Sequence, residues 1–189
     1  SDELLYLLGR SYAGPDDEIV FHEHAFIMYC LIALGIGATP VKAPEVELTA
    51  HVDSMLDAVS ERTRVVFIAN PNNPTGSYIP AEELTRLRAG LRDDIMLVID
   101  SAYAEYITRN DYSAGAELVD ASDNTVMTRT FSKAYALGGV RLGWAYCPQD
   151  VADVLNRVRG PFNVSLPAQA AGIAALEDAS FLAVSRDHN

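Results

Sequence analysis

The chain has 189 residues, of which 49% are hydrophobic and 21% are charged, and its formal net charge at pH 7 is -12. This length suits one compact domain with a real core, and the acidic balance excludes nucleic acid and anionic lipid as main partners, because phosphate groups repel such a surface. No apolar run approaches the ~20 residues of a membrane span, and the two cysteines, Cys30 and Cys147, lack metal or redox spacing, which favours buried thiols in a reducing cytoplasm.

The first part of the chain alternates between helices and strands. Ser1-Asp2-Glu3 precede a leucine-rich helix and act as its cap, so the free N–H groups of the first turn form a candidate anion site, with ordinary helix capping as the alternative. We expect strands at 19–21 and 39–42 and helices at 27–34 and 54–59.

The segment His22-Glu23-His24 raises the question of a metal site. The two histidines are two positions apart, and the sequence offers no third ligand in a matching pattern. We therefore expect no metal site in this protein.

A fully apolar strand at 64–69 is of the kind that is buried on both faces in a parallel sheet. It leads into Asn70-Pro71-Asn72-Asn73-Pro74-Thr75-Gly76. Such a loop is rigid, an X-Pro bond in it can be cis, and an amide side chain can be fixed in a crevice. A plain strand-to-helix turn is the alternative.

The next helix begins at Pro80 and buries its leucines, while Arg86, Arg88 and Arg92 are assigned to its solvated side. The strand at 95–99 then ends on Asp100. A carboxylate at the end of a hydrophobic strand is costly unless it has a partner. A protonated pyridine nitrogen would be such a partner, and helix capping is the competing role.

After a polar insert at 110–124, the strand at 126–128 leads to Thr130, Ser132 and Lys133. Lys133 has apolar and small neighbours in sequence, so we expect desolvation to favour its neutral amine, which attacks aldehydes. Arg141 follows eight residues later with a planar fork suited to phosphate. Together these groups fit a ligand that carries both an aldehyde and a phosphate, whereas a surface lysine and a salt-bridged arginine are the simpler interpretation of each alone.

Further elements are expected at 142–147, a strand, and at 151–158 and 166–176, both helices. Strands that alternate with helices predict an α/β protein with three layers, α/β/α, around a mostly parallel sheet. Polar residues follow the ends of several strands, so the site should lie along the carboxyl edge of the sheet.

Three motifs in this order, N-P-N-N-P-T-G, D-S-A-Y and T-F-S-K with an arginine eight residues after the lysine, resemble the fold type I aminotransferases that depend on pyridoxal 5'-phosphate (PLP). The segments H-A-F-I-M-Y and S-K-A-Y-A-L-G-G-V-R-L-G are similar to the histidinol-phosphate aminotransferase branch of that family. The resemblance implies that residues 1–189 form a PLP-binding large domain, truncated at both ends and without the small C-terminal domain.

The resemblance also implies a role for each matching residue. Lys133 would hold the cofactor covalently and move a proton at the substrate α-carbon, and Asp100 would keep the pyridine nitrogen protonated. The other cofactor contacts would be Asn73 and Tyr103 at the phenolic oxygen, Phe26 and Ala102 at the two ring faces, and Thr130, Ser132, Arg141, Ser1 and Asp2 at the phosphate.

The activity implied is transamination between a small-molecule amino donor, glutamate, and a keto acceptor such as imidazole-acetol phosphate, in a cytoplasmic homodimer. An aromatic aminotransferase and a threonine-phosphate decarboxylase share the same cofactor residues and stay open as alternatives. An aminotransferase-like regulatory binding domain and an inactive fragment are the alternatives of another class.

Overall fold

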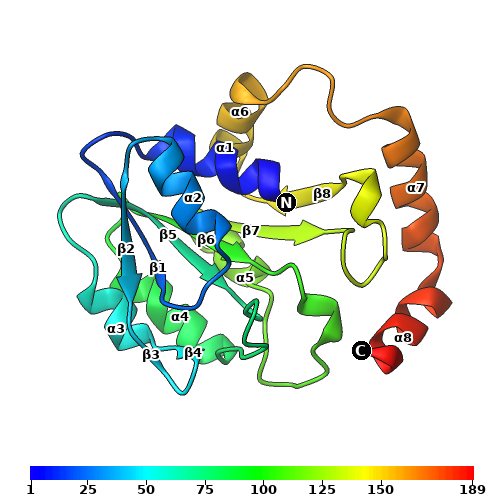
Figure 1. Cartoon of the computed structure of the whole chain (residues 1–189), viewed down its shortest axis with the longest axis horizontal. Helices are drawn as coiled ribbons and strands as arrows, with labels where there is room; N and C mark the ends of the chain where they lie inside the picture. The colour runs from blue at the N-terminus through cyan, green and yellow to red at the C-terminus, as the bar shows by residue number, and fades with distance from the viewer.

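The computed structural model describes residues 1–189 and is built around a six-stranded sheet in the order β2-β1-β5-β6-β7-β8 (Figure 1). Neighbouring strands are parallel except β8, which runs antiparallel to β7. The strands are β1 (Glu18–His22), β2 (Thr39–Ala43), β5 (Thr63–Ala69), β6 (Met96–Asp100), β7 (Thr125–Thr130) and β8 (Gly143–Tyr146).

Helices cover both faces of this sheet. One face packs against α1 (Asp2–Tyr12), α2 (Met28–Gly35) and α6 (Gln149–Val158). The other face packs against α3 (Val52–Asp57), α4 (Ala81–Gly90) and α5 (Ala116–Asp120). The predicted three-layer α/β/α fold with a mostly parallel sheet is therefore confirmed.

The central strand β5 shows why its sequence predicts a position inside the sheet. Val65 and Phe67 point into the core beneath α1 and α2, and Val66 and Ile68 point into the core beneath α4. All four side chains are 0% exposed. Because successive strand residues face opposite sides, a strand buried on both faces must be apolar throughout.

The last two helices, α7 (Leu166–Glu177) and α8 (Ala179–His188), lie beyond β8 at the right of Figure 1. Only Ala168 and Gly172 of α7 are buried, and α8 has no buried residue. No helix combines the length and the apolar content that crossing a membrane requires.

The predicted elements are present, with boundaries that differ by a few residues. The sequence patterns did not predict the short hairpin of β3 (Glu45–Val46) and β4 (Thr49–Ala50), nor α5 within the polar insert at 110–124. These are segments of two to five residues, which are too short to show a periodic pattern.

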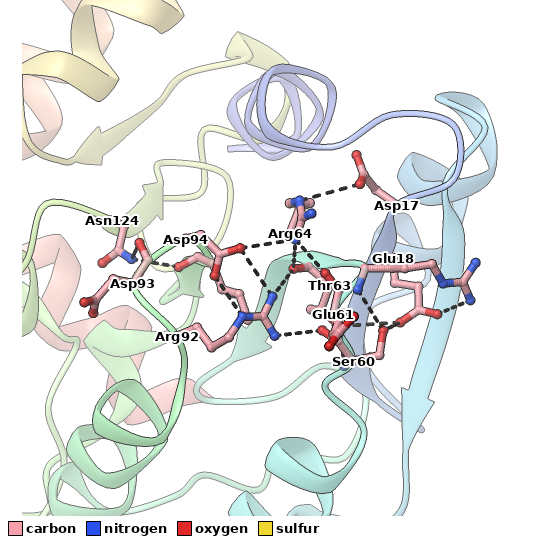
Figure 2. Close-up of polar contacts among 12 residues, drawn as sticks. Asp17, Glu18, Ser60, Glu61, Thr63, Arg64, Arg92, Asp93, Asp94 and Asn124 are labelled. Carbon is pink, nitrogen blue, oxygen red and sulfur yellow. Dashed lines mark hydrogen bonds and ion pairs between the residues drawn. The ribbon is translucent and has the colours of Figure 1, made fainter.

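Polar side chains hold together the amino ends of the strands, at the edge opposite the predicted site (Figure 2). Arg92 Nη1 donates to Ser60 O at 2.8 Å and its Nη2 donates to Thr63 O at 3.2 Å, while its Nε pairs with Asp94 at 2.9 Å. Arg64 donates to Asp94 Oδ2 at 3.2 Å. Arg92 is exposed, as expected for a solvated side chain, but it lies beyond the end of α4 and its contacts give it a structural role.

Arg88 was assigned to the same solvated side of the helix, but its guanidinium donates to the backbone oxygens of Ile95 and Leu91, each at 3.0 Å. Glu18 is the buried acid of the network and accepts hydrogen bonds from Ser60 and Arg62. These contacts tie the turns before β5 and β6 to the start of β1. They leave the carboxyl edge of the sheet to form the site.

Candidate active site

A single pocket at the carboxyl edge of the sheet brings together all eleven residues that the sequence and the resemblance predict for the site. It receives residues from the start of α1, the ends of β5, β6 and β7, and the loops that follow them. The lining consists of Ser1, Asp2, Phe26, Asn73, Asp100, Ala102, Tyr103, Thr130, Ser132, Lys133 and Arg141, together with Ala69 and Pro71.

Asp100 forms the floor of the pocket as the last residue of β6 and is only 5% exposed. The Tyr29 hydroxyl donates to its Oδ2 at 2.9 Å, and Thr128 Oγ1 donates to its Oδ1 at 3.3 Å. Burial nevertheless raises the pKa of Asp100 above its usual value, because desolvation disfavours the charged form. A cation in the pocket next to this carboxylate would be stabilised.

Tyr29 is a site residue that the sequence reasoning missed. It is fully buried in α2, stacks on Phe67 with ring centroids 4.8 Å apart, and places its hydroxyl on Asp100. Burial and the neighbouring Asp100 hold the pKa of Tyr29 well above its usual value, so the hydroxyl stays a donor. The signal that could have revealed it is a tyrosine inside an otherwise apolar helix, since a buried hydroxyl needs a partner.

Lys133 lies in the connection between β7 and β8 and reaches into the pocket, with Nζ 5.4 Å from the ring centroid of Tyr103. Lys133 is exposed, so the expectation that its amine is desolvated is wrong. The apolar neighbours on which that expectation rested, Phe131 and Ala134, are 5% and 1% exposed. They turn into the protein, while Lys133 turns toward the pocket.

An anion-binding arrangement occupies one end of the pocket. Arg141 adopts a left-handed backbone conformation with φ 58°, and its guanidinium donates to Gly138 O at 2.8 Å and to Ser132 Oγ at 3.3 Å. It also pairs with Asp2 at 3.3 Å, at the N-terminal end of α1. Thr130 adds a second hydroxyl from the end of β7. A cation, two hydroxyls and a helix N-terminus are together suited to a phosphate.

The loop after β5 is held by two of its asparagines and presents the third to the pocket. Asn70 exchanges hydrogen bonds with the backbone of Ile79, at 3.1 and 2.9 Å. Asn72 donates to Thr75 Oγ1 at 2.8 Å. Asn73 faces the pocket, and the peptide bonds before Pro71 and Pro74 are both cis. A cis X-Pro bond and an asparagine at the crevice are thus present, as expected.

His22 and His24, which raised the metal question, both contact one carboxylate of the β3–β4 hairpin. His22 Nδ1 lies 2.7 Å from Glu45 Oε1, and His24 Nδ1 lies 2.9 Å from Glu45 Oε2. Burial lowers the pKa of His22, and the two histidines lower the pKa of Glu45 despite its burial. The histidines therefore have a structural role that anchors the hairpin to the end of β1.

The two cysteines are half-buried, which corrects the expectation of fully buried thiols. Burial still raises the pKa of the Cys147 thiol and so keeps it protonated. Neither cysteine lines the pocket described above.

Comparison with known proteins finds similarity along the whole chain. Residues 1–188 match the family model described as aminotransferase class I and II. A histidinol-phosphate aminotransferase of Paramagnetospirillum magneticum is 63% identical over 189 residues, which are 100% of this chain and 52% of that protein. One of Rhodospirillum centenum is 61% identical over the same share of each chain. The chain thus spans about half the length of these curated relatives.

Solved structures agree with these relatives. The structure titled as histidinol-phosphate aminotransferase from Sinorhizobium meliloti in complex with pyridoxal-5'-phosphate superposes with a TM-score of 0.91 at 30% identity, covering 97% of this chain and 50% of that chain. A Thermus thermophilus aspartate aminotransferase superposes with a TM-score of 0.89 at 22% identity, covering 98% and 53% of the two chains. The latter identity supports the fold alone.

Proposed function

The chain belongs to the aminotransferase class I and II family, and from this premise we propose that the whole protein is a PLP-dependent histidinol-phosphate aminotransferase. The resemblance to fold type I aminotransferases that the three motifs predicted is confirmed. The observation that carries the proposal further is the pocket, which gathers the predicted site residues of all three motifs at one edge of the sheet.

The residues of the pocket fit this cofactor. An amine, a buried carboxylate, and an arginine beside two hydroxyls are the groups that an aldehyde, a pyridine nitrogen and a phosphate require. When bound, PLP supplies an electron sink that stabilises negative charge at the substrate α-carbon. We propose that residues 1–189 form the PLP-binding domain of the whole protein.

Lys133 and Asp100 would carry the chemistry within this chain. Lys133 would bind the cofactor covalently until the substrate amine takes its place, and the freed amine of Lys133 would then move a proton from the substrate α-carbon to the cofactor. The carboxylate of Asp100 would hold the pyridine nitrogen in its protonated form, and this charge pair would reverse the pKa rise that burial causes.

The remaining lining residues would bind and orient. Asn73 and Tyr103 would donate to the phenolic oxygen, with Phe26 and Ala102 on the two faces of the ring. Phe26 makes an edge-to-face contact with Tyr29, with the ring planes at 90° and the ring centroids 6.0 Å apart. This contact fixes the orientation of the Phe26 ring.

The phosphate would be bound at the other end of the pocket, by Thr130, Ser132, Arg141 and the backbone amides at Ser1 and Asp2. In this arrangement the Asp2 carboxylate pairs with Arg141 from the side and keeps the guanidinium in place. Because the arginine fork is planar and rigid, it fixes the orientation of the phosphate as well as its charge.

We further propose glutamate as amino donor, imidazole-acetol phosphate as acceptor, and a cytoplasmic homodimer as the working form. The similar proteins named histidinol-phosphate aminotransferase support a histidinol-phosphate substrate, and the family resemblance supports glutamate as donor and the dimer. Sedimentation or light scattering of the full-length protein would test the dimer, which a monomer under assay conditions would contradict.

Residues 1–189 contain two lysines, Lys133 and Lys42, of which only Lys133 lines the pocket. The full-length protein with added PLP is expected to show an absorbance band from a covalently bound cofactor, and borohydride reduction is expected to label Lys133. Lys133→Ala should lose both the label and transamination of imidazole-acetol phosphate by glutamate.

Lys42 lies on the edge strand β2, outside the pocket, so Lys42→Ala is the matched control and should retain both properties. A label on Lys42, or no bound cofactor in the full-length protein, would exclude the proposed site. Amination of aromatic keto acids but not of imidazole-acetol phosphate would exclude the proposed substrate.

A further inference from the structure

A partly buried ion pair joins two segments that contribute to the pocket, although neither of its residues lines the pocket. Arg129 Nη2 donates to Glu105 Oε1 at 2.6 Å, and the two side chains are 19% and 7% exposed. The Arg129 guanidinium also lies 5.7 Å from the ring centroid of Trp144, its cross-strand neighbour on β8. Because a buried charge is costly without its partner, this pair is held to a narrow range of geometries.

The pair connects the two segments that carry facing residues of the pocket. Glu105 lies in the 3-10 turn η1 (Ala104–Tyr106), two residues after Tyr103. Arg129 lies on β7, four residues before Lys133. Across the pocket, Lys133 Nζ is 5.4 Å from the Tyr103 ring centroid. The ion pair therefore spans the same two segments from the other side.

The backbone alone gives the Tyr103 segment little support at this point. The β6–β7 ladder ends at Asp100 and Thr128, and Ser101 N adds one bond to Thr128 O at 3.0 Å. Beyond it the chain leaves the sheet for η1, and the carboxylate of Glu105 continues the connection to β7.

We propose that Glu105 and Arg129 are positioning residues that fix the distance between Tyr103 and Lys133, an inference that rests on the proposed function. Arg129 Nε is buried and has no hydrogen-bond partner, so Glu105 is the group that compensates the guanidinium. Without that carboxylate the guanidinium must move toward water or another acceptor, and η1 loses its link to β7.

The effect has a spectroscopic readout in the cofactor-loaded protein. A hydroxyl that donates to the deprotonated form of an oxygen favours that form. Displacement of Tyr103 from the phenolic oxygen should therefore raise the midpoint of the pH titration of the bound cofactor's visible absorbance. A loss of stability alone would leave this midpoint unchanged.

The test compares Glu105→Gln with Glu18→Gln in the full-length protein. The two glutamates are 7% and 8% exposed and each pairs with an arginine, but Glu18 lies at the opposite edge of the sheet. Both variants should lower the melting temperature. Only Glu105→Gln should raise the absorbance midpoint, by about 1 pH unit, and lower kcat about tenfold with a smaller change in KM.

Arg129→Lys is the second variant, and it decides the question if Glu105→Gln does not fold. It keeps the charge but loses the fork, so it should shift the midpoint in the same direction by a smaller amount. An unshifted midpoint and unchanged kcat in the variants, or an equal shift in Glu18→Gln, would overturn the proposal. Absence of transaminase activity from the unsubstituted protein would instead overturn the proposed function.

Discussion

At the scale of single residues, the buried carboxylate of Asp100 lowers the stability of the protein when no cation lies against it. Its carboxylate is buried and accepts from Tyr29 and Thr128, yet desolvation outweighs these two hydrogen bonds and raises its pKa. Without a cation in the pocket, the folded state therefore binds this proton more tightly than the unfolded state. A positive group such as a pyridinium against the carboxylate would add to these hydrogen bonds and stabilise the charged form of Asp100.

Asp100→Asn is expected to raise the melting temperature of the cofactor-free protein at pH 7 while it weakens PLP binding at least about tenfold. The amide is neutral at every pH and carries no desolvation penalty of a buried charge. Melting scans without cofactor and a PLP titration of the same preparations would measure both effects. A melting temperature below that of the unsubstituted protein would show that Asp100 is stabilising as a carboxylate.

The same substitution makes a pH-dependent prediction whose sign follows from linkage. A carboxyl group with a raised folded pKa contributes stability that is fully present below its unfolded pKa, near 3.8, and is lost as pH rises through the folded pKa. The advantage of Asp100→Asn should therefore be absent near pH 3.5 and grow toward neutral pH.

The lining of the pocket could be predicted because Asp100, Thr130, Ser132, Lys133 and Arg141 form an ordered set with few structural explanations, and because the family resemblance supplied the other lining residues. The sequence did not predict the direction in which individual side chains point. Lys133 has apolar neighbours in sequence, yet it turns to the open pocket while Phe131 turns inward. Tyr29 and the Glu105–Arg129 pair depend on contacts between segments distant in the sequence.

At the scale of elements, the end of the pocket that contains Arg141 depends on a close approach between α1 and β8. A Cβ at Gly143 would collide with the Ser1 backbone nitrogen and would lie 2.9 Å from Arg129 O. Both obstacles are backbone atoms, which cannot rotate away as a side chain can. The glycine thus permits the start of α1 to sit beside the strand that follows Arg141.

Gly143→Ala is expected to destabilise the protein by about 1 to 3 kcal/mol, the usual cost of overpacking, and to weaken binding of the cofactor phosphate. Chemical denaturation and a PLP titration would measure the two effects. Gly139→Ala in the same connection is the matched control, because a Cβ there meets no atom within 4 Å. Equal behaviour of the two variants would show that the close approach is not required.

Helices and strands were predictable from the sequence where a consistent hydrophobic pattern runs along their length. β5 and β6 are buried on both faces, so their sequences read as continuous apolar runs. The antiparallel direction of β8 was not predicted, since a four-residue strand whose exposure alternates carries no record of its direction. The connection that carries Lys133, residues 131–142, returns the chain beside β7 in the opposite direction.

At the scale of the whole molecule, charge is unbalanced, with 26 acidic and 14 basic residues and a formal net charge of -12. Many basic side chains are engaged at the amino edge of the sheet, where Arg62, Arg64 and Arg92 pair with acidic groups. The remaining acids repel one another across the surface, and this repulsion opposes the compact state.

Added sodium chloride is therefore expected to raise the melting temperature at pH 7. Between 0.01 M and 0.15 M salt the Debye length falls from about 30 Å to about 8 Å, so the long-range repulsion is screened first. Exposed pairs such as Arg92–Asp94 are weakened by the same salt, but ion pairs in contact with water contribute little to stability. Near pH 4.6, the isoelectric point of the sequence, the repulsion vanishes and the same salt should bring no gain. A melting temperature that falls with salt at pH 7 would mean that the ion pairs of the amino edge outweigh the net charge.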